Sequence, residues 1–249
     1  MTWRGAGEAR RPAAKARPVR SRPERASSGS GWQGAIGQML RPGSEAPVLS
    51  WGIVGLTVVL WLGGLFTGGL PFLFLAVTPS LSLQVWRFFT APVVYPNDFF
   101  YLIAILLSGV FILLTAPAVE KNLGRGRFLV LALAAAGVGS AAMVLSGNAA
   151  FGLSGVLFGM FGSYLIFVWA YPPARAQALI IIGINLLINI AFGGFTLPQI
   201  IGGLIAGAGA TYLFQRYDDR ASSKARTPYL IIAAVVVGLI VLAIVRSAL

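Results

Sequence analysis

The sequence predicts an all-α polytopic membrane protein with a six-helix core and a seventh transmembrane helix near the C-terminus. Composition is the first reason: 57% of the residues are hydrophobic and 10% are charged, whereas about a quarter are charged in soluble domains. The second reason is that the apolar residues form long blocks separated by short connectors. The chain contains no histidine and no cysteine, which excludes the usual general base and disulfides. We expect neither a metal nor a cofactor.

Residues 1–44 form a basic region that precedes the first apolar block. Nine Lys and Arg residues stand there against Glu8 and Glu24, and Pro, Ala, Ser and Gly fill most of the rest. Such a segment cannot bury enough apolar surface to fold. We expect a disordered cytoplasmic tail whose charge orients the first helix. The alternative is an arm that binds anionic lipid or nucleic acid, but nucleic acid is disfavoured because Trp3 is the only aromatic residue among the basic residues up to Arg25.

The first predicted span covers residues 48–66, and a less regular segment, 68–97, follows it. Pro79 and the polar residues after it argue against a second span in this segment. We therefore predict an amphipathic hairpin lying partly in the outer interface, with Trp86 and Arg87 at headgroup depth.

Six further apolar blocks have about the length that a bilayer requires. The first five complete a membrane domain over residues 45–214, and the sixth follows a basic linker within residues 215–249. A tight bend at Gly193-Gly194 separates two of the spans. In order, the predicted spans are 99–118, 128–145, 152–170, 178–195, 197–214 and 229–245.

The distribution of basic residues predicts how the chain crosses the membrane. With seven spans and a cytoplasmic N-terminus, every Lys and Arg except Arg87 and Arg246 falls on the cytoplasmic side, as the positive-inside rule requires. A full crossing by residues 68–97 would move the later loops to the other side and destroy this bias. We expect a plasma membrane protein with its C-terminus outside.

A short polar turn opens the predicted span that begins at residue 152. Ser154 lies there between Gly152 and Gly155. Gly155 and Gly159 share one helix face, and Gly203 and Gly207 show the same spacing in the span 197–214. We expect the two glycine faces to meet, because small residues let helices approach closely in lipid. This packing by itself requires no function.

Four sequence pieces, in the right order and with the right number of spans between them, extend this observation. Over residues 48–214 the chain resembles the rhomboid family of intramembrane serine peptidases. The pieces are Trp86-Arg87 in the first outer loop, Glu120 to Gly124 after the second span, Gly152-Leu153-Ser154-Gly155 at the start of the fourth, and Ile200 to Gly207 in the sixth. The resemblance implies that Ser154 stands at the nucleophile position.

The sequence departs from the family at the residues that assist the nucleophile. The resemblance implies a histidine base where this chain has Ile200, opposite Ser154. It also implies a histidine and an asparagine that hold the oxyanion, where this chain has Ala104 and Ser108. Gln199 is no substitute, because an amide is not basic near neutral pH.

No other residue is expected to activate Ser154. The three lysines lie in the tail or in inner loops, and Asp98 is the only acidic residue of the outer half. A serine hydroxyl is a poor nucleophile unless a neighbour takes its proton. We therefore expect Ser154 to cap its helix, or to bond a backbone carbonyl, and to assist close packing.

Two further polar residues, Asn185 and Asn189, lie on one face of the fifth span. Buried amides in lipid usually bond neighbouring helices. Alternatively, the two asparagines line a cavity or lateral groove for a substrate helix.

Three functions follow from these observations. The first is a pseudoprotease that binds transmembrane segments of client proteins within the lipid bilayer and does not cut them. The second is an active serine endopeptidase that uses Ser154 with an unusual activation. The third, a transporter or channel subunit, is disfavoured because the spans carry almost no charge.

Overall fold

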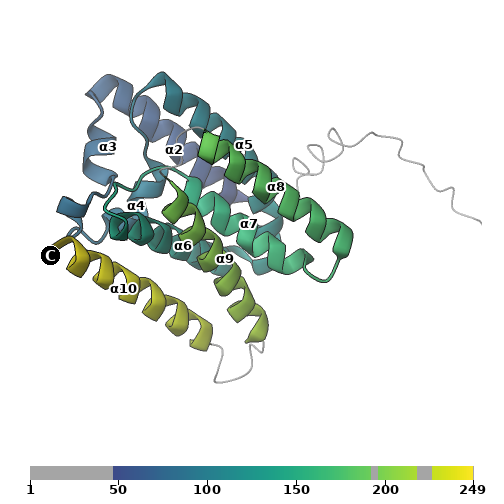
Figure 1. The fold of residues 1–249 in the computed structure, drawn as a ribbon. Coiled ribbons are helices and arrows are strands. Elements are labelled where there is room, and N and C mark those ends of the chain that lie inside the picture. The colour runs from purple at the N-terminus through teal and green to yellow at the C-terminus, as the bar shows by residue number, and fades with distance from the viewer. Residues whose placement is uncertain (1–46, 192–195, 218–225, 249) are drawn as a thin grey trace, which may run out of the picture. The chain divides into compact units, whose positions relative to one another are not determined.

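The computed structural model describes residues 47–191, 196–217 and 226–248. The predicted tail, the predicted Gly193-Gly194 bend and the middle of the linker lie outside the described residues. Seven long helices in the described ranges correspond to the seven predicted spans (Figure 1). They are α2 (Val48–Thr67), α5 (Phe99–Leu123), α6 (Arg125–Leu145), α7 (Ser154–Val168), α8 (Pro172–Ala191), α9 (Leu197–Arg216) and α10 (Thr227–Ala248).

Six of these helices are long and apolar enough to cross a membrane, and the seventh, α7, has 15 residues. The described residues contain no β-strand, only an isolated antiparallel bridge between Val77 and Ala150. The prediction of an all-α polytopic membrane protein is thereby confirmed. One connector is shorter than predicted: α5 continues to Leu123, and only Gly124, whose φ is 79°, separates it from α6. A positive φ at this turn favours glycine.

The segment between α2 and α5 contains four short helices instead of the predicted hairpin. They are α3 (Leu70–Leu75), η1 (Pro79–Leu81), α4 (Arg87–Thr90) and η2 (Ala91–Val93). Pro71, Pro79 and Pro92 lie in the first two positions of α3, η1 and η2. Proline is favoured there, because its fixed φ suits a helix start and its missing N–H would be unpaired anyway. The prolines thus divide the segment into single turns.

Trp86 and Arg87 face different surroundings within this segment. Trp86 is 58% exposed, whereas Arg87 is 5% exposed. The Arg87 Nη1 atom donates hydrogen bonds to the carbonyls of Leu73 (2.8 Å) and Ala76 (2.7 Å) at the end of α3. Arg87 therefore satisfies carbonyls that the short helix leaves unpaired. The placement of both residues at headgroup depth stays a prediction.

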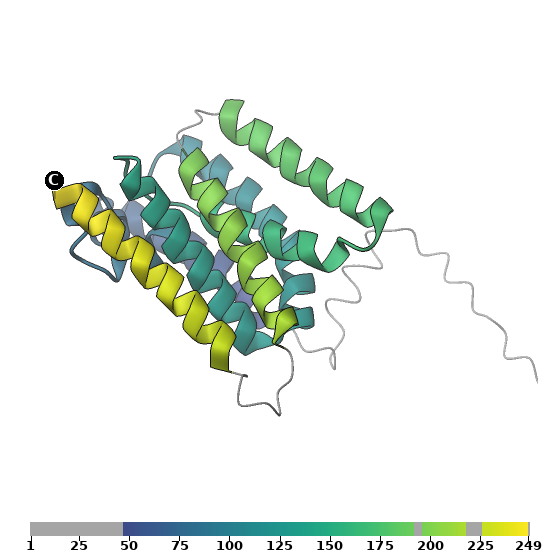
Figure 2. The ribbon, with the colours of Figure 1, turned by 60° about the horizontal axis from the view of Figure 1, so that its bottom comes forward.

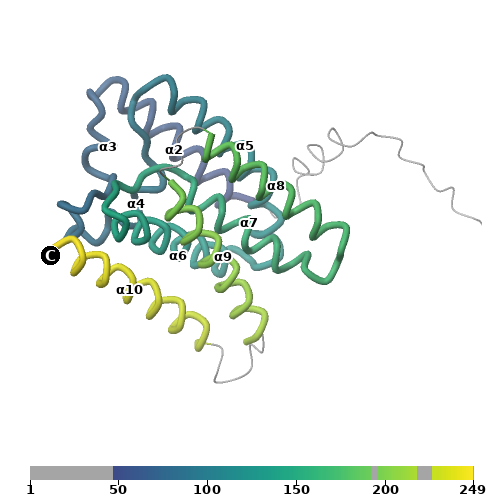
Figure 3. The backbone as a smooth tube through the Cα atoms, viewed as in Figure 1, coloured from purple at the N-terminus to yellow at the C-terminus, as the bar shows by residue number. Residues whose placement is uncertain are grey.

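The glycine faces of α7 and α9 pack against each other, as predicted; Figure 3 follows the two backbones. A Cβ atom added to Gly203 would overlap the backbone of Gly155, and one added to Gly207 would overlap the backbone of Gly159. We call these four residues the glycine seam. The same helices pack against α6, most of which is buried. Without side chains at the seam the backbones approach to contact distance.

Glu120, near the end of α5, holds the start of α2. Its carboxylate accepts hydrogen bonds from the backbone N–H groups of Leu49 and Ser50 and from the Ser50 hydroxyl. Glu120 and Ser50 are both buried. A carboxylate at a helix N-terminus satisfies unpaired N–H groups and interacts favourably with the helix dipole. Glu120 thus joins the first and second spans.

The two outlying helices pack differently. Helix α10 runs alongside α6 (Figure 2), with Val236 against Gly137. Near the C-terminal end of α10, the Ser247 and Ser82 hydroxyls are hydrogen bonded at 2.6 Å. Helix α8, by contrast, buries only Ala178 and Asn185.

Candidate functional site

A cavity of about 380 Å³ lies at the N-terminal end of α7. Helix α5 supplies much of its wall, α8 contributes Ile188 and Asn189, and Ser154 and Gln199 come from the starts of α7 and α9. Cavities of this volume are typical of small-molecule sites. The α5 residues that line it are Phe100, Tyr101, Ile103, Ala104, Leu107 and Ser108.

The turn before Ser154 is held by the loop that follows α4. Gly152 has a φ of 79°, and its N–H donates to the carbonyls of Ala91 and Val94. A Cβ atom at this position would meet the ring of Tyr95. The next N–H, of Leu153, donates to the Tyr95 hydroxyl at 2.8 Å. Only glycine suits this positive φ beside a ring, so the sequence fixes a tight turn that places Ser154 in the cavity.

Ser154 is the first residue of α7 and is partly exposed. Its hydroxyl makes no hydrogen bond with any residue that the structure describes. The expected capping or carbonyl bond is therefore not observed, since the N-cap position belongs to Leu153, which makes no side-chain cap. The Ser154 hydroxyl is left available to the cavity.

Gln199 is a cavity residue whose role the sequence did not predict. Its side chain is fully buried, and its Nε2 donates to the carbonyl of Gly152 at 2.9 Å. The Oε1 atom accepts no hydrogen bond from the described residues. Such groups are rare in folded proteins and require an explanation. The sequence did contain one signal for this role, because Gln199 is an amide side chain near the start of an otherwise apolar helix.

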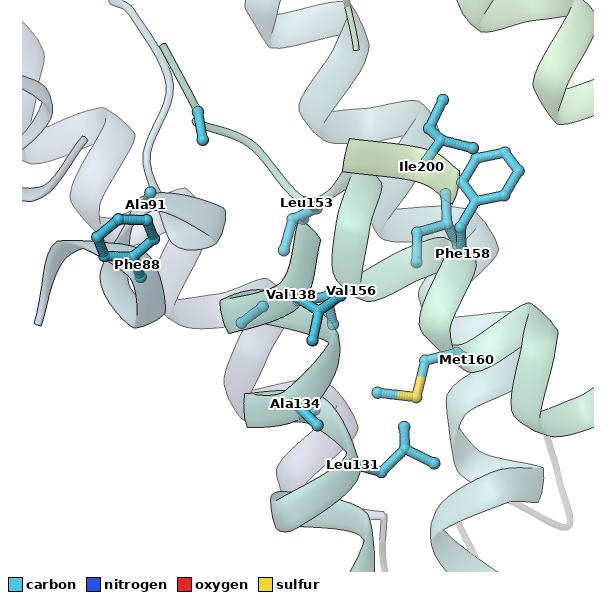
Figure 4. Close-up of a cluster of buried hydrophobic side chains, with 14 of the residues drawn as sticks. Phe88, Ala91, Leu131, Ala134, Val138, Leu153, Val156, Phe158, Met160 and Ile200 are labelled. Carbon is cyan, nitrogen blue, oxygen red and sulfur yellow. The ribbon is translucent and has the colours of Figure 1, made fainter. Parts of the chain in front are cut away.

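Ile200, predicted to lie opposite Ser154, is not among the described residues that line the cavity. It belongs to the buried hydrophobic cluster, and Figure 4 shows it beside the ring of Phe158. Gln199 therefore lines the cavity with Ser154, and Ile200 packs in the hydrophobic cluster. The equivalence of Ile200 to the family's base position stays a prediction.

Ala104 and Ser108, the residues at the predicted oxyanion positions, both line the cavity with Ser154. Ser108 is hydrogen bonded to the hydroxyl of Tyr95, which lies in the loop outside the spans. Burial raises the pKa of the Tyr95 phenol above its ordinary value of 10, although hydrogen bonds from Leu153 and Ser108 oppose the shift. The phenol is therefore neutral at physiological pH and does not act as a base.

Both asparagines bond within their own helix, and Asn189 also bonds Thr196, the N-cap residue of the neighbouring helix α9, so the expected pairing between helices is found for Asn189 and not for Asn185. Asn185 donates to the carbonyl of Ile181, and Asn189 donates to that of Asn185. The amides use carbonyls one turn back, which lie within reach along any helix. Only Asn189 lines the cavity, where its Oδ1 accepts from Thr196 at 3.3 Å.

The described lining contains no histidine, carboxylate or lysine. The described residues also contain no cluster of three His, Cys, Asp or Glu side chains that would hold a metal ion. What the arrangement offers is a neutral cavity lined by the hydroxyls of Ser154 and Tyr101, which are unpaired among the described residues.

Comparison with known proteins gives one result. A family model described as the Rhomboid domain matches residues 82–217, which is more than half of the chain. No curated protein matches the sequence. The matched range includes the loop of Arg87, the turn at Gly152 and the glycine seam.

Proposed function

The chain belongs to the rhomboid family, and we propose that it is a non-cleaving member that binds transmembrane segments of client proteins. The observation that carries this proposal is the cavity around Ser154. The described residues that line it include no group able to take the serine proton near neutral pH.

The missing base has a large kinetic consequence. In soluble serine proteases, loss of the histidine lowers the rate by a factor on the order of 10⁴–10⁶. The Gln199 amide cannot replace it, and the Tyr95 phenol holds its proton because burial raises its pKa. Ser154 therefore remains a hydroxyl and not an activated nucleophile.

The lateral wall of the cavity supports a binding role. The cavity lies between α5 and α8, and α8 buries few of its residues. Ile103 and Leu106 on α5 and Leu187 on α8 are exposed apolar side chains. A client helix would meet an apolar surface here.

Reactivity of Ser154 is the primary test. Purified full-length protein is treated with a fluorophosphonate probe and, separately, with a model transmembrane substrate. We expect no labelling and no cleavage beyond the level of Ser154→Ala. Labelling or cleavage that disappears in Ser154→Ala would refute the proposal and support an active endopeptidase.

Histidine substitutions test whether the base alone is missing. Gln199→His places an imidazole in the cavity, and Ile200→His places it at the family's base position. We expect one of the two to make Ser154 reactive to the probe, with Ser154→Ala as the control in each background. Silence in both would mean that Ala104 and Ser108 have removed the oxyanion site as well.

Client binding is tested by crosslinking, which the absence of cysteine from the chain makes simple. A single cysteine at Ile188 carries a photocrosslinker into the cavity wall, and one at Val241, exposed on α10, is the matched control. We expect crosslinks from Ile188 alone that map to transmembrane segments of other proteins. Equal crosslinking from both positions would contradict a specific groove.

The active endopeptidase is the alternative, because family membership and an accessible Ser154 both favour it. Labelling of the unmodified chain by the fluorophosphonate probe separates the two functions.

We further propose that the N-terminus is cytoplasmic and the C-terminus external in the plasma membrane. Trp86→Cys should then react with an impermeant maleimide on intact cells. Lys121→Cys should react only after lysis, and the reverse pattern would invert the topology.

A further inference from the structure

A second pocket, of about 470 Å³, lies where α6 and α10 begin. We call it the basic pocket, because three of the residues that line it are arginines. Arg125 and Arg127 belong to the first turn of α6, and Arg226 immediately precedes α10. Among the described residues that line this pocket there is no carboxylate. Its lining therefore brings several positive charges close together.

The direction of the two helices adds to this charge. Both begin at the basic pocket, and further along them Val236 packs against Gly137, so α6 and α10 run side by side in the same direction (Figure 2). Each helix has the positive end of its dipole at its N-terminus. Two positive helix ends and three guanidinium groups thus meet in one place, where negative charge is the favourable choice.

Neither helix start contains the residues that usually neutralise such an end. The described first turns of α6 and α10 hold no acidic residue, and the N-cap of α6, Gly124, makes no side-chain hydrogen bond. The first N–H groups of a helix have no carbonyl partner within that helix. A local rule that is broken at two adjacent helix starts indicates a functional constraint. The group that would satisfy both starts is an anion.

Helix α9 holds one side of the basic pocket in place. The ring centroid of Phe214, which is buried, lies 5.5 Å from Arg127 Cζ and 5.4 Å from the ring centroid of Tyr229. Tyr229 lines the pocket and adds a hydroxyl to it. One fixed ring therefore positions two lining residues that come from two different helices, so this side of the pocket is formed before a ligand arrives.

The surroundings of the basic pocket favour a lipid over a soluble anion. The pocket lies at the ends of two helices that are long and apolar enough to span a membrane, and lipid headgroups lie at that depth. Leu129 and Leu230 each follow a pocket arginine by four residues, which places them one turn further along α6 and α10. Both leucines are exposed. An acyl chain would contact them while its phosphate lies among the arginines.

We propose that the basic pocket binds the headgroup of an anionic phospholipid. The phosphate oxygens accept hydrogen bonds from the guanidinium groups of Arg125 and Arg226, which match phosphate in geometry and charge, and from the first N–H groups of α6. The proposal does not rest on the proposed function, because the basic pocket shares no lining residue with the Ser154 cavity.

A general preference of arginine for one side of the membrane is the competing explanation. Arg175 provides the comparison. It lies in the first turn of α8, with its Cζ 5.3 Å from the ring centroid of Trp169, and it does not line the basic pocket. If only the number of charges mattered, Arg175 and Arg226 would be equivalent.

Native mass spectrometry of the purified full-length chain tests the proposal. The chain in detergent receives equal amounts of dioleoylphosphatidylglycerol and dioleoylphosphatidylcholine. We expect one phosphatidylglycerol per chain to be retained, at least tenfold in preference to phosphatidylcholine. Glycerol 1-phosphate carries a phosphate but no acyl chain, and at tenfold excess over the lipid it should leave this retention unchanged.

Variants assign the effect to the basic pocket. Arg125→Gln and Arg226→Gln should each lower the preference for phosphatidylglycerol at least fivefold, and the double variant should abolish it. Arg175→Gln removes the same charge elsewhere and should bind like the unmodified chain. Phosphatidylglycerol should also raise the thermal unfolding midpoint of the unmodified chain and of Arg175→Gln, but not that of the double variant.

Three results would overturn the proposal. Equal retention of the two phospholipids would show that the site does not select negative charge. A loss in Arg175→Gln as large as in Arg226→Gln would show that total charge decides. Displacement by glycerol 1-phosphate would indicate a site for soluble phosphates. These results involve neither the reactivity of Ser154 nor crosslinking at Ile188, so this inference and the proposed function can fail separately.

Discussion

The glycine seam and the wall formed by α5 and α8 show two ways of arranging helices in one membrane domain. At the seam, backbones meet with no side chain between them, and α6 beside them is largely buried. At the wall, α8 buries only Ala178 and Asn185, and a cavity separates parts of α5 and α8. The difference suggests that the seam fixes the scaffold while the wall is free to admit a ligand.

The largest effect is expected at the seam. Gly207→Ala places a Cβ against the Gly159 backbone, where nothing can yield cheaply. We expect a loss of about 3 kcal/mol or more, because overpacked cores lose 1–3 kcal/mol and backbone contacts relax least. Thermal unfolding in detergent measures it. Gly209→Ala, on the same helix in open space, is the control; equal effects would show that the seam is not tightly packed.

A smaller effect is expected from the polar contact beside the seam. The Thr211 hydroxyl donates to that of Ser163 at 2.6 Å, and both residues are fully buried. Thr211→Val should cost about 1–3 kcal/mol, because it leaves a buried hydroxyl unpaired. Adding Ser163→Ala should restore part of the loss. A double variant no more stable than the single one would mean that the contact carries little energy.

Tyr95 joins the outer loop to the turn at Ser154. Tyr95→Phe should cost about 1 kcal/mol, because the Leu153 N–H loses its acceptor. Burial raises the folded-state pKa of Tyr95 above 10. The folded chain therefore holds this proton more tightly, and its contribution to stability is present below about pH 10 and lost as the pH rises through the folded pKa. Between pH 9 and 11 the free energy of unfolding should fall less steeply with pH in Tyr95→Phe than in the unmodified chain. Parallel curves for the two proteins would contradict this.

The smallest effect is expected on the wall. Leu187 is 66% exposed on α8, so Leu187→Ala should change stability by less than about 0.5 kcal/mol. Leu157→Ala, the same change at a buried residue of α7, should cost about 2–5 kcal/mol. Similar losses at both positions would show that α8 is packed as tightly as α7.

Local sequence patterns were enough to predict most of the fold. Apolar blocks of bilayer length gave the seven helices, and glycines four residues apart gave the contact between α7 and α9. These patterns suffice because length and close approach are properties of the helices themselves. The structure of the segment between α2 and α5 was harder to predict from local patterns. Its prolines break it into single turns, and these are held by residues distant in sequence, such as Arg87.

The features of the candidate site also fall into those that the sequence predicts and those that depend on tertiary structure. The sequence alone determined that the chain has no histidine, that Ser154 opens a helix, and that Ala104 and Ser108 stand one turn apart on another. Only the tertiary structure decided that Gln199 and not Ile200 shares the cavity with Ser154, because neighbouring positions on a helix point about 100° apart. It also decided that the amide oxygen and the serine hydroxyl lack partners, since pairing depends on where distant helices bring their polar groups.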